Sequence, residues 1–246
     1  KRCILARQIN RRPDPSDQLR TCQKGSPVGE PAAGDEQPIL APDHQRRGIG
    51  TLLALKGFAA AMLGVRAVVC MAENATPTKI EATRGYGAEV VLHGSIWDEA
   101  DEKARELVAS EGLTYVHPFD DLDLISGQGT LGLEIHEDWP EAEVVVVPIG
   151  GGGLISGVSA ALKRECPAIR IVGVESSDGP AMQRSVEAGE LVTLDRCDTI
   201  IDGLRVKRVG VHTFELVSRF VDEVVAVPDE TIFESVLWTM ERCKLV

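Results

Sequence analysis

Four consecutive glycines are the part of the chain best suited to chemistry. They occupy residues 150–153, after the apolar run EVVVVPI at residues 143–149 and before an apolar segment that begins at Leu154. Each glycine costs roughly 0.5–1 kcal/mol of ordering entropy relative to alanine, so four in succession need a physical reason. Backbone N–H groups without a Cβ can approach an anion closely, and the positive end of a helix dipole attracts it. The run predicts a phosphate-binding turn, with a permissive turn as the alternative.

The spacing around the glycines leaves the phosphate compound open. No Lys-Ser or Lys-Thr pair follows them, which excludes a nucleotide P-loop. Gly151 and Gly153 supply two glycines of a dinucleotide-binding fingerprint, and Glu175 ends the next apolar run at a distance that suits a ribose-binding acid. Ser156 stands where that fingerprint has its third glycine, so the match is imperfect.

The elements that must position this turn follow from the apolar pattern after residue 52. Strands and helices alternate with short connections, which predicts parallel strands joined by right-handed crossovers and hence a doubly wound α/β fold with mostly parallel sheets. The predicted strands are residues 66–71, 89–92, 114–117, 143–149, 170–175 and 223–227. The predicted helices are residues 52–63 (closed by Gly64), 77–86, 96–110, 130–137, 154–165, 182–188 and 230–244.

The first 50 residues differ from the rest. Prolines recur there at positions 13, 15, 27, 31, 38 and 42, and neither strand nor helix periodicity is sustained. Such a composition buries too little apolar area to offset the entropy of ordering. We therefore expect an irregular segment over residues 1–50, a smaller α/β lobe over 51–140, and part of a larger lobe over 141–246.

Composition excludes several partners. The net charge of −12 disfavours nucleic acid, because phosphate backbones need a clustered basic surface. No apolar run approaches the roughly 18 residues of a membrane span, and the N-terminus lacks the apolar core of a secretory signal. The six cysteines show neither close pairing nor metal-ligand spacing. We expect a reduced, cytoplasmic protein with no nucleic-acid or membrane partner.

Further motifs follow one another along the chain. They are KIEATRGYGAEV at residues 79–90, HPFDD at 117–121, GQGT at 127–130, the glycine turn, and DGL with VKR between 202 and 208. Together they resemble the threonine/serine ammonia-lyase family, which includes the serine racemases and belongs to the fold-type II enzymes that use pyridoxal phosphate (PLP). The motifs occur in family order over roughly three quarters of the chain, so chance agreement is implausible.

The resemblance implies a tryptophan-synthase-β-like fold, PLP as cofactor and an amino acid as substrate. It also implies deamination of L-threonine or L-serine to a 2-oxo acid and ammonia, a carbon–nitrogen lyase reaction of amino-acid metabolism such as isoleucine biosynthesis. A homo-oligomer is implied as well. The residues carried over for cofactor binding hold the phosphate through backbone amides or lie against the pyridine ring: Gly150, Gly151, Gly152, Gly153 and Leu154 for the phosphate, and Gly203 for the ring.

Other candidates have structural alternatives. By resemblance, Asp120 and Gly127–Gly129 border the pocket, while a helix-capping turn explains them equally well. Glu175 matches a metal ligand of some relatives, but its partner position holds Ala181, so we predict a solvated strand-end acid and no metal. His117 is expected to be structural rather than a general base.

The family's chemistry depends on a lysine that binds PLP as a Schiff base, in a motif like SFKxRG, and on a later loop like SAGNH. Neither motif occurs: Lys24 lies in QKGS, Lys56 lies in LKGF, and GIGT at residues 48–51 lacks the Asn and His of the second loop. Relatives also continue past residue 246 into a strand and a turn that meets the pyridine nitrogen, so we expect an incomplete larger lobe. No catalytic residue is assigned.

We therefore predict PLP-dependent deamination of L-threonine or L-serine, with loss of activity if no lysine replaces the missing motif. Two alternatives stay open. One is an NAD-type oxidoreductase, which depends on Gly151, Gly153 and Glu175. The other is a non-catalytic α/β remnant of the family.

Overall fold

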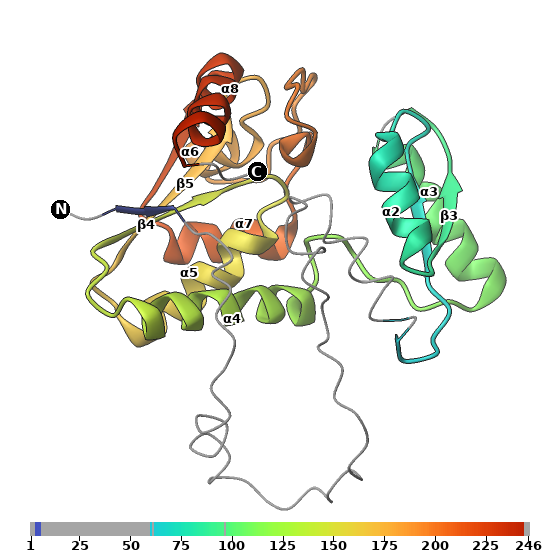
Figure 1. The fold of residues 1–246 in the computed structure, drawn as a ribbon, viewed down its shortest axis with the longest axis horizontal. Coiled ribbons are helices and arrows are strands. Elements are labelled where there is room, and N and C mark those ends of the chain that lie inside the picture. Colours follow the sequence, from blue (N-terminus) through green and yellow to red (C-terminus); the bar gives the residue numbers. More distant parts are fainter. Residues whose placement is uncertain (1–2, 6–59, 61, 96, 244–246) are drawn as a thin grey trace, which may run out of the picture. The chain divides into compact units, whose positions relative to one another are not determined.

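The computed structural model describes residues 3–5, 60, 62–95 and 97–243, and they form two parallel sheets (Figure 1). The larger sheet has the strand order β1-β4-β5-β6, and the smaller one pairs β2 with β3. Every pairing in both sheets is parallel. The strands are β1 (Cys3–Leu5), β2 (Val68–Met71), β3 (Glu89–Leu92), β4 (Val144–Pro148), β5 (Arg170–Ser176) and β6 (Glu223–Val227).

Helices connect these parallel strands, as the predicted doubly wound α/β fold requires. The helices are α2 (Pro77–Gly85), α3 (Trp97–Glu111), α4 (Leu122–Asp138), α5 (Gly153–Glu165), α6 (Ala181–Ala188), α7 (Val211–Phe220) and α8 (Asp229–Trp238). A short 3-10 turn, η3, covers Asp202–Leu204, and a π-helical segment, η4 (Thr239–Cys243), follows α8.

The main core lies between the larger sheet and its helices. Val145 and Val147 alternate with less buried residues along β4, as expected of a strand with one face turned to the core. From α5, Ile155, Val158 and Leu162 fill the same cluster at helical spacing. This packing fixes both ends of the turn that joins β4 to α5.

Two glycines allow α4 and α5 to approach closely. A Cβ on Gly132 would lie 2.8 Å from the carbonyl oxygen of Val158, and one on Gly129 would lie 3.3 Å from that of Gly157. Both glycines belong to α4, which begins at Leu122, eight residues earlier than predicted, and so includes residues 127–130. Gly127–Gly129 is thus not a capping turn, because it lies inside α4, where Gly129 allows close packing against α5; its place at the border of a pocket stays a prediction.

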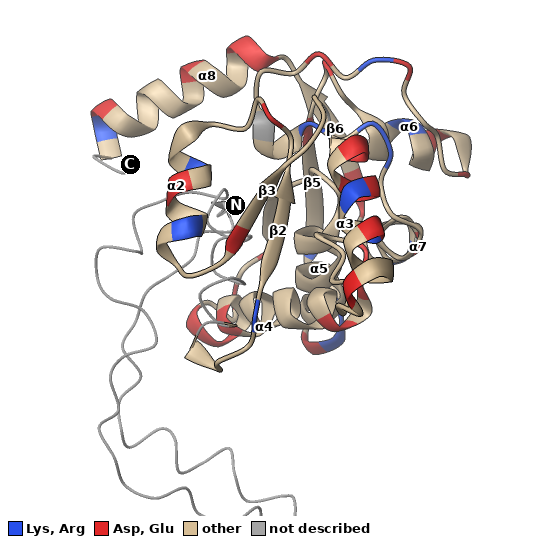
Figure 2. Cartoon of the chain, turned by 90° about the vertical axis from the view of Figure 1, so that its right-hand side faces the viewer, with Lys and Arg blue, Asp and Glu red and all other residues tan. Residues whose placement is uncertain are grey.

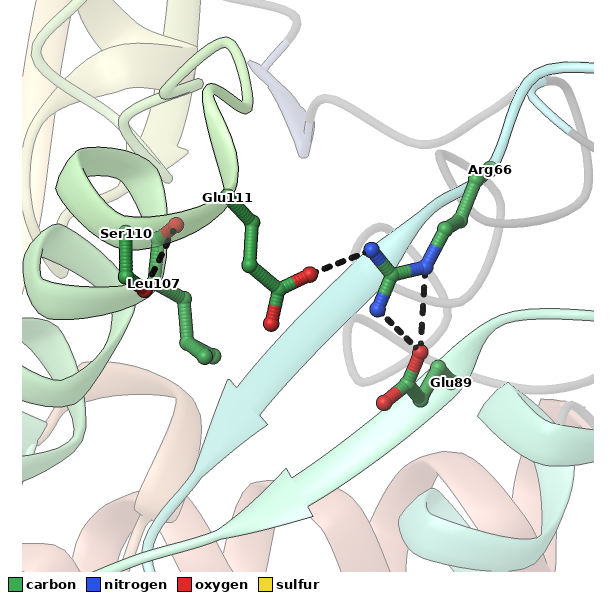
Figure 3. A network of polar contacts seen from close by, with 5 residues as sticks. All are labelled: Arg66, Glu89, Leu107, Ser110 and Glu111. Carbon is green, nitrogen blue, oxygen red and sulfur yellow. Dashed lines mark hydrogen bonds and ion pairs between the residues drawn. The ribbon is translucent and has the colours of Figure 1, made fainter.

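The smaller sheet has a thinner core and a charged edge. Its main buried cluster is Val69, Met71 and Ala88, packed by partly buried neighbours such as Ile80. Figure 3 shows the guanidinium of Arg66 donating to Glu89 at the start of β3 and to Glu111 at the end of α3. Charged residues also run along α3, whereas α8 is mostly uncharged (Figure 2).

Several element predictions are confirmed. The strands at 89–92 and 223–227 have the predicted bounds, and the other predicted strands and helices of the described region agree within two residues, apart from the helix predicted at 130–137, which begins at Leu122, and those discussed next. Gly64 has a φ of 66°, as a glycine that closes a helix often does. Most of the predicted helix 52–63 lies outside the described residues. The domain division at residues 50 and 140 stays a prediction.

Four predictions are wrong in part. Residues 114–117 form no strand, because no described strand pairs with them. The irregular segment 1–50 contains a strand at Cys3–Leu5, where an apolar triplet pairs with Val144–Val146. Helix α7 lies where no helix was predicted. The predicted helix 230–244 is α-helical only to Trp238, after which η4 follows. Within the described residues, no helix combines the length and apolar character needed to cross a bilayer.

Candidate phosphate-binding site

The glycine turn joins the end of β4 to the first residue of α5. Gly152 stands at the N-cap with a φ of 93°, a left-handed conformation that glycine adopts most easily. A Cβ at this position would lie 2.8 Å from Met182 Cε and 2.8 Å from Thr213 Cβ. Gly152 is therefore required both by its backbone conformation and by its neighbours.

The remaining glycines of the turn allow close contact with two other segments. A Cβ on Gly150 would lie 2.6 Å from the carbonyl oxygen of Gly203. A Cβ on Gly151 would collide with the ring of Phe119, and one on Gly153 would lie 2.9 Å from the Phe119 carbonyl oxygen. The fold thus brings together the glycine turn and Gly203, the two places from which the cofactor-binding residues were predicted.

The backbone amides at this turn are available to an anion. Among the described residues, none accepts a hydrogen bond from the N–H of Gly151, Gly152, Gly153 or Leu154, and the first N–H paired within the helix is that of Ser156, which donates to Gly152 O. No side chain caps α5 either. Adjacent N–H groups at a positive helix end fit a phosphate, so the residues present suit the phosphate of PLP.

The segment 117–121 caps two helices, α4 and α7, through its acidic side chains. The Nδ1 atom of His117 accepts hydrogen bonds from the backbone N–H of Asp120 (2.8 Å) and Phe119 (3.2 Å), which confirms the structural role predicted for it. Asp121 caps α4 by accepting from Leu124 N at 2.9 Å. Asp120 caps a different helix: its carboxylate accepts from the first amides of α7, beginning with Val211 N at 2.9 Å. A capping role is therefore right for Asp120, although the helix is distant in sequence.

Glu175 is buried, which contradicts the prediction of a solvated acid. Its side chain reaches the N-terminus of α6, where Oε1 accepts from Met182 N (2.9 Å) and Oε2 from Gln183 N (2.8 Å). Burial raises the pKa of Glu175 to about 7, against the smaller opposing effect of these two hydrogen bonds. Both carboxylate oxygens accept hydrogen bonds from α6, so Glu175 is not placed to bind a ribose. The dinucleotide hypothesis therefore lacks the acidic residue on which it depended.

A second buried carboxylate fixes the segment that leads to Gly203. Asp229 accepts hydrogen bonds from the hydroxyl of Ser176, the hydroxyl of Thr199 (2.9 Å) and the backbone N–H of Ile200 (2.7 Å). Burial alone would raise the pKa of Asp229, but these hydrogen bonds outweigh it and hold the pKa below its ordinary value. The carboxylate thus ties the end of β5, the start of α8 and the chain before η3 to one another.

Lys24 and Lys56, the lysines considered in place of the missing motif, lie outside the described residues. Within the described part, Lys163 pairs with Asp222, Lys103 pairs with Glu106, and Lys207 donates to a backbone carbonyl. No group of three or more His, Cys, Asp or Glu residues in the described ranges could hold a metal ion.

Sequence reasoning missed Thr213 and Asp229, because neither has a local signal. Thr213 stands in the unpredicted helix α7, and its hydroxyl donates to Gly151 O at 2.8 Å. A helix needs only one N-cap residue, but two acidic residues, Asp120 and Asp121, precede α4. The additional carboxylate was the signal for Asp120.

Comparison with known proteins gives the family. The family model described as "Pyridoxal-phosphate dependent enzyme" matches residues 55–246. The chain is 43% identical over 212 residues to an L-threonine ammonia-lyase of Thermotoga maritima, covering 84% of this chain and 53% of the relative. It is 42% identical over 186 residues to the catabolic L-threonine dehydratase TdcB of Escherichia coli, covering 76% and 56%. The chain spans about half the length of these curated relatives.

Solved structures agree with the family model. Maize serine racemase matches with a TM-score of 0.76 at 32% identity, covering 83% of this chain and 64% of that one. The threonine deaminase of tomato (Solanum lycopersicum, isoform 2, processed form) matches with a TM-score of 0.74 at 34% identity, covering 82% and 60%. None of the relatives named here is an oxidoreductase, which leaves the NAD hypothesis without support. With a family match over most of its length and parallel α/β sheets like those of these enzymes, the chain belongs to the family of pyridoxal-phosphate dependent enzymes.

Proposed function

We propose that the protein is an ammonia-lyase that deaminates L-threonine or L-serine to a 2-oxo acid and ammonia, with PLP as its cofactor. One observation carries the proposal: the glycine turn presents unpaired amides at the N-terminus of α5, directly beside Gly203. Relatives named as threonine ammonia-lyase, threonine dehydratase and threonine deaminase support the choice of reaction and substrate.

The proposed roles follow from the geometry. The amides of Gly150–Gly153 and Leu154 bind the cofactor phosphate, and the positive end of the α5 dipole adds to that attraction. Gly203 would border the pyridine ring, since the absence of a Cβ allows close approach. When bound, PLP supplies the electron sink for loss of the α-proton and the β-hydroxyl.

Proton transfer at the α-carbon needs a base, and in this family a lysine provides it. The motif that carries that lysine has no match in this chain. No lysine of this chain is assigned to that role, and Lys24 and Lys56 are the two candidates that the labelling experiment below tests. This part of the proposal can fail while cofactor binding holds.

Cofactor binding is tested with one variant in the turn and one matched control. Both Gly152 and Gly189 have positive φ, but a Cβ on Gly189 meets nothing within 4 Å. We expect Gly152→Ala to weaken PLP binding roughly tenfold or more, because strain and collision displace the amides. Gly189→Ala should leave binding unchanged. Absence of saturable PLP binding to the unaltered chain would refute the cofactor assignment.

Catalysis is tested by borohydride reduction of the full chain with PLP, followed by peptide mapping. A pyridoxyl label on Lys24 or Lys56, together with 2-oxo acid formed from L-threonine, supports deamination by this chain. Binding of PLP without either signal would refute it and would favour the non-catalytic remnant.

Two expectations from the sequence belong to this proposal. The protein is proposed to form a homo-oligomer, which sedimentation velocity measures directly; a monomer at micromolar concentration would contradict it. It is proposed to act in the cytoplasm on a small amino acid, without nucleic-acid or membrane partners.

A further inference from the structure

A buried hydroxyl holds one peptide group of the glycine turn. Thr213 Oγ1 lies 2.8 Å from the carbonyl oxygen of Gly151 and 3.2 Å from that of Gly210. A hydroxyl has one hydrogen to donate, and the shorter distance favours Gly151 as its acceptor. Thr213 is fully buried, so water does not compete for this hydrogen bond.

This hydrogen bond also sets the direction of an amide. The C=O of Gly151 and the N–H of Gly152 belong to one planar trans peptide and point in opposite directions. With the carbonyl turned toward Thr213, the N–H of Gly152 faces the other way, where no described residue accepts a hydrogen bond from it. That N–H is one of those available to the phosphate.

The peptide needs such a constraint because glycine stands on both sides of it. Without Cβ atoms, the plane between Gly151 and Gly152 can rotate with little steric resistance. Gly152 has a φ of 93°, so the observed orientation is one of several that a glycine pair can adopt. An interaction from outside the turn must select it, and Thr213 is placed to do so.

Thr213 is itself anchored from a distant segment. Asp120 accepts hydrogen bonds from the backbone N–H of Thr213 (3.2 Å) and His212 (2.9 Å), in addition to Val211. The N-cap of α7, Gly210, has no side chain to cap the helix, and a Cβ there would collide with Asp120. Asp120 thus replaces the missing cap and fixes the first turn of α7, which carries the Thr213 hydroxyl.

We propose that Thr213, anchored by Asp120, is a positioning residue that orients the Gly151–Gly152 peptide so that the N–H of Gly152 faces the cofactor phosphate. The inference rests on the proposed function, since it assumes that the turn binds the phosphate of PLP. It adds to that function a residue from α7 that does not touch the cofactor.

The experiment compares Thr213→Val with Thr213→Ser in the full chain. Valine has nearly the same shape but cannot donate, whereas serine keeps the hydroxyl. Dissociation constants are measured for PLP and for pyridoxal, which lacks the phosphate. We expect Thr213→Val to weaken PLP binding roughly tenfold, because the Gly152 N–H would lose its hydrogen bond to the charged phosphate. Binding of pyridoxal should stay the same. Thr213→Ser should stay within about twofold of the unaltered chain.

A purely structural role for Thr213 would lower the melting temperature without changing the ratio of the two dissociation constants, and that result would overturn the inference. If the unaltered chain binds neither PLP nor inorganic phosphate, the proposed function fails first. If it binds PLP and Thr213→Val binds equally well, only the positioning role fails.

A second measurement decides the matter should Thr213→Val not fold. Amide resonances of the unaltered, nitrogen-15-labelled chain are followed during titration with inorganic phosphate. The inference requires the Gly152 amide to shift with saturation. Shifts at Gly153 and Leu154 with Gly152 unmoved would overturn it.

Discussion

The regions around the two sheets use their residues in different ways. Around the larger sheet, fully buried residues such as Val145 and Ile171 form the core, and the buried carboxylates of Glu175 and Asp229 have two and three hydrogen-bond partners respectively. Around the smaller sheet, the described buried apolar residues are fewer (Val69, Met71, Tyr86, Ala88 and Ala100), and charged contacts such as that of Arg66 with Glu89 lie at the surface.

The difference shows that buried, directional hydrogen bonds are concentrated around the larger sheet. Three carboxylates in this region are buried or partly buried: those of Asp120, Glu175 and Asp229. Each accepts hydrogen bonds from backbone N–H groups of helices and turns near the glycine turn. Such bonds are directional and are strengthened by exclusion of water. The arrangement suits a region that must hold amides in place for a ligand, whereas surface ion pairs contribute little rigidity.

The largest expected effect comes from matched core deletions in the two regions. Leu162 is fully buried under the larger sheet, and Ile80 packs partly buried against the smaller one. The two side chains are isomers, so replacement by alanine removes the same number of atoms. We expect Leu162→Ala to lower the free energy of unfolding by about 3–5 kcal/mol, and Ile80→Ala by about 1–2 kcal/mol, because a partly buried site leaves a smaller cavity. Urea denaturation measures both.

An equal decrease in the free energy of unfolding in these two variants would contradict the proposal that the region around the larger sheet is the more deeply packed one. A further control is Leu133→Ala, since Leu133 is exposed on α4. That variant should change the free energy of unfolding by less than about 0.5 kcal/mol, as surface substitutions usually do.

A smaller effect is expected from the ionisation of Glu175. Its pKa is raised from 4.5 to about 7 by burial, so the folded chain binds more protons than the unfolded chain between these values. The resulting stability is present below pH 4.5 and is lost as the pH rises through 7. The loss amounts to about 3 kcal/mol at most, at 1.36 kcal/mol per pH unit.

The variant Glu175→Gln should remove this pH dependence, because glutamine does not ionise in that range. Chemical denaturation at several pH values compares the two proteins. The same slope of stability against pH in both would show that Glu175 contributes nothing to it.

The smallest effect is expected at the surface network of the smaller sheet. Arg66 contacts Glu89 and Glu111 while its side chain is exposed to solvent (Figure 3). Exposed ion pairs are screened by water and salt, so Arg66→Ala should leave the melting temperature almost unchanged, and added salt should remove what difference there is. A clear salt-resistant decrease in the melting temperature would mean that this edge is held more firmly than its exposure indicates.

The sequence by itself determined the place of the glycine turn and the order of most strands and helices, although it did not predict β1 or α7. These features depend on local signals: the continuous apolar run of β4, the amphipathic spacing of α5, and the four consecutive glycines between them. Family motifs along the chain added the cofactor and the proposed reaction class. The same local signals failed for residues 114–117, where a strand-like pattern has no described partner strand.

Only the tertiary structure decided how the turn is held. Thr213 reaches Gly151 across 62 positions, and Asp120 reaches Thr213 across 93. Glu175 was predicted to be solvated, but it is buried because α6 folds back over the end of β5 and offers it two amides. Contacts of this kind have no local pattern, since they depend on which segments the packed core brings together rather than on the residues next to each in the chain.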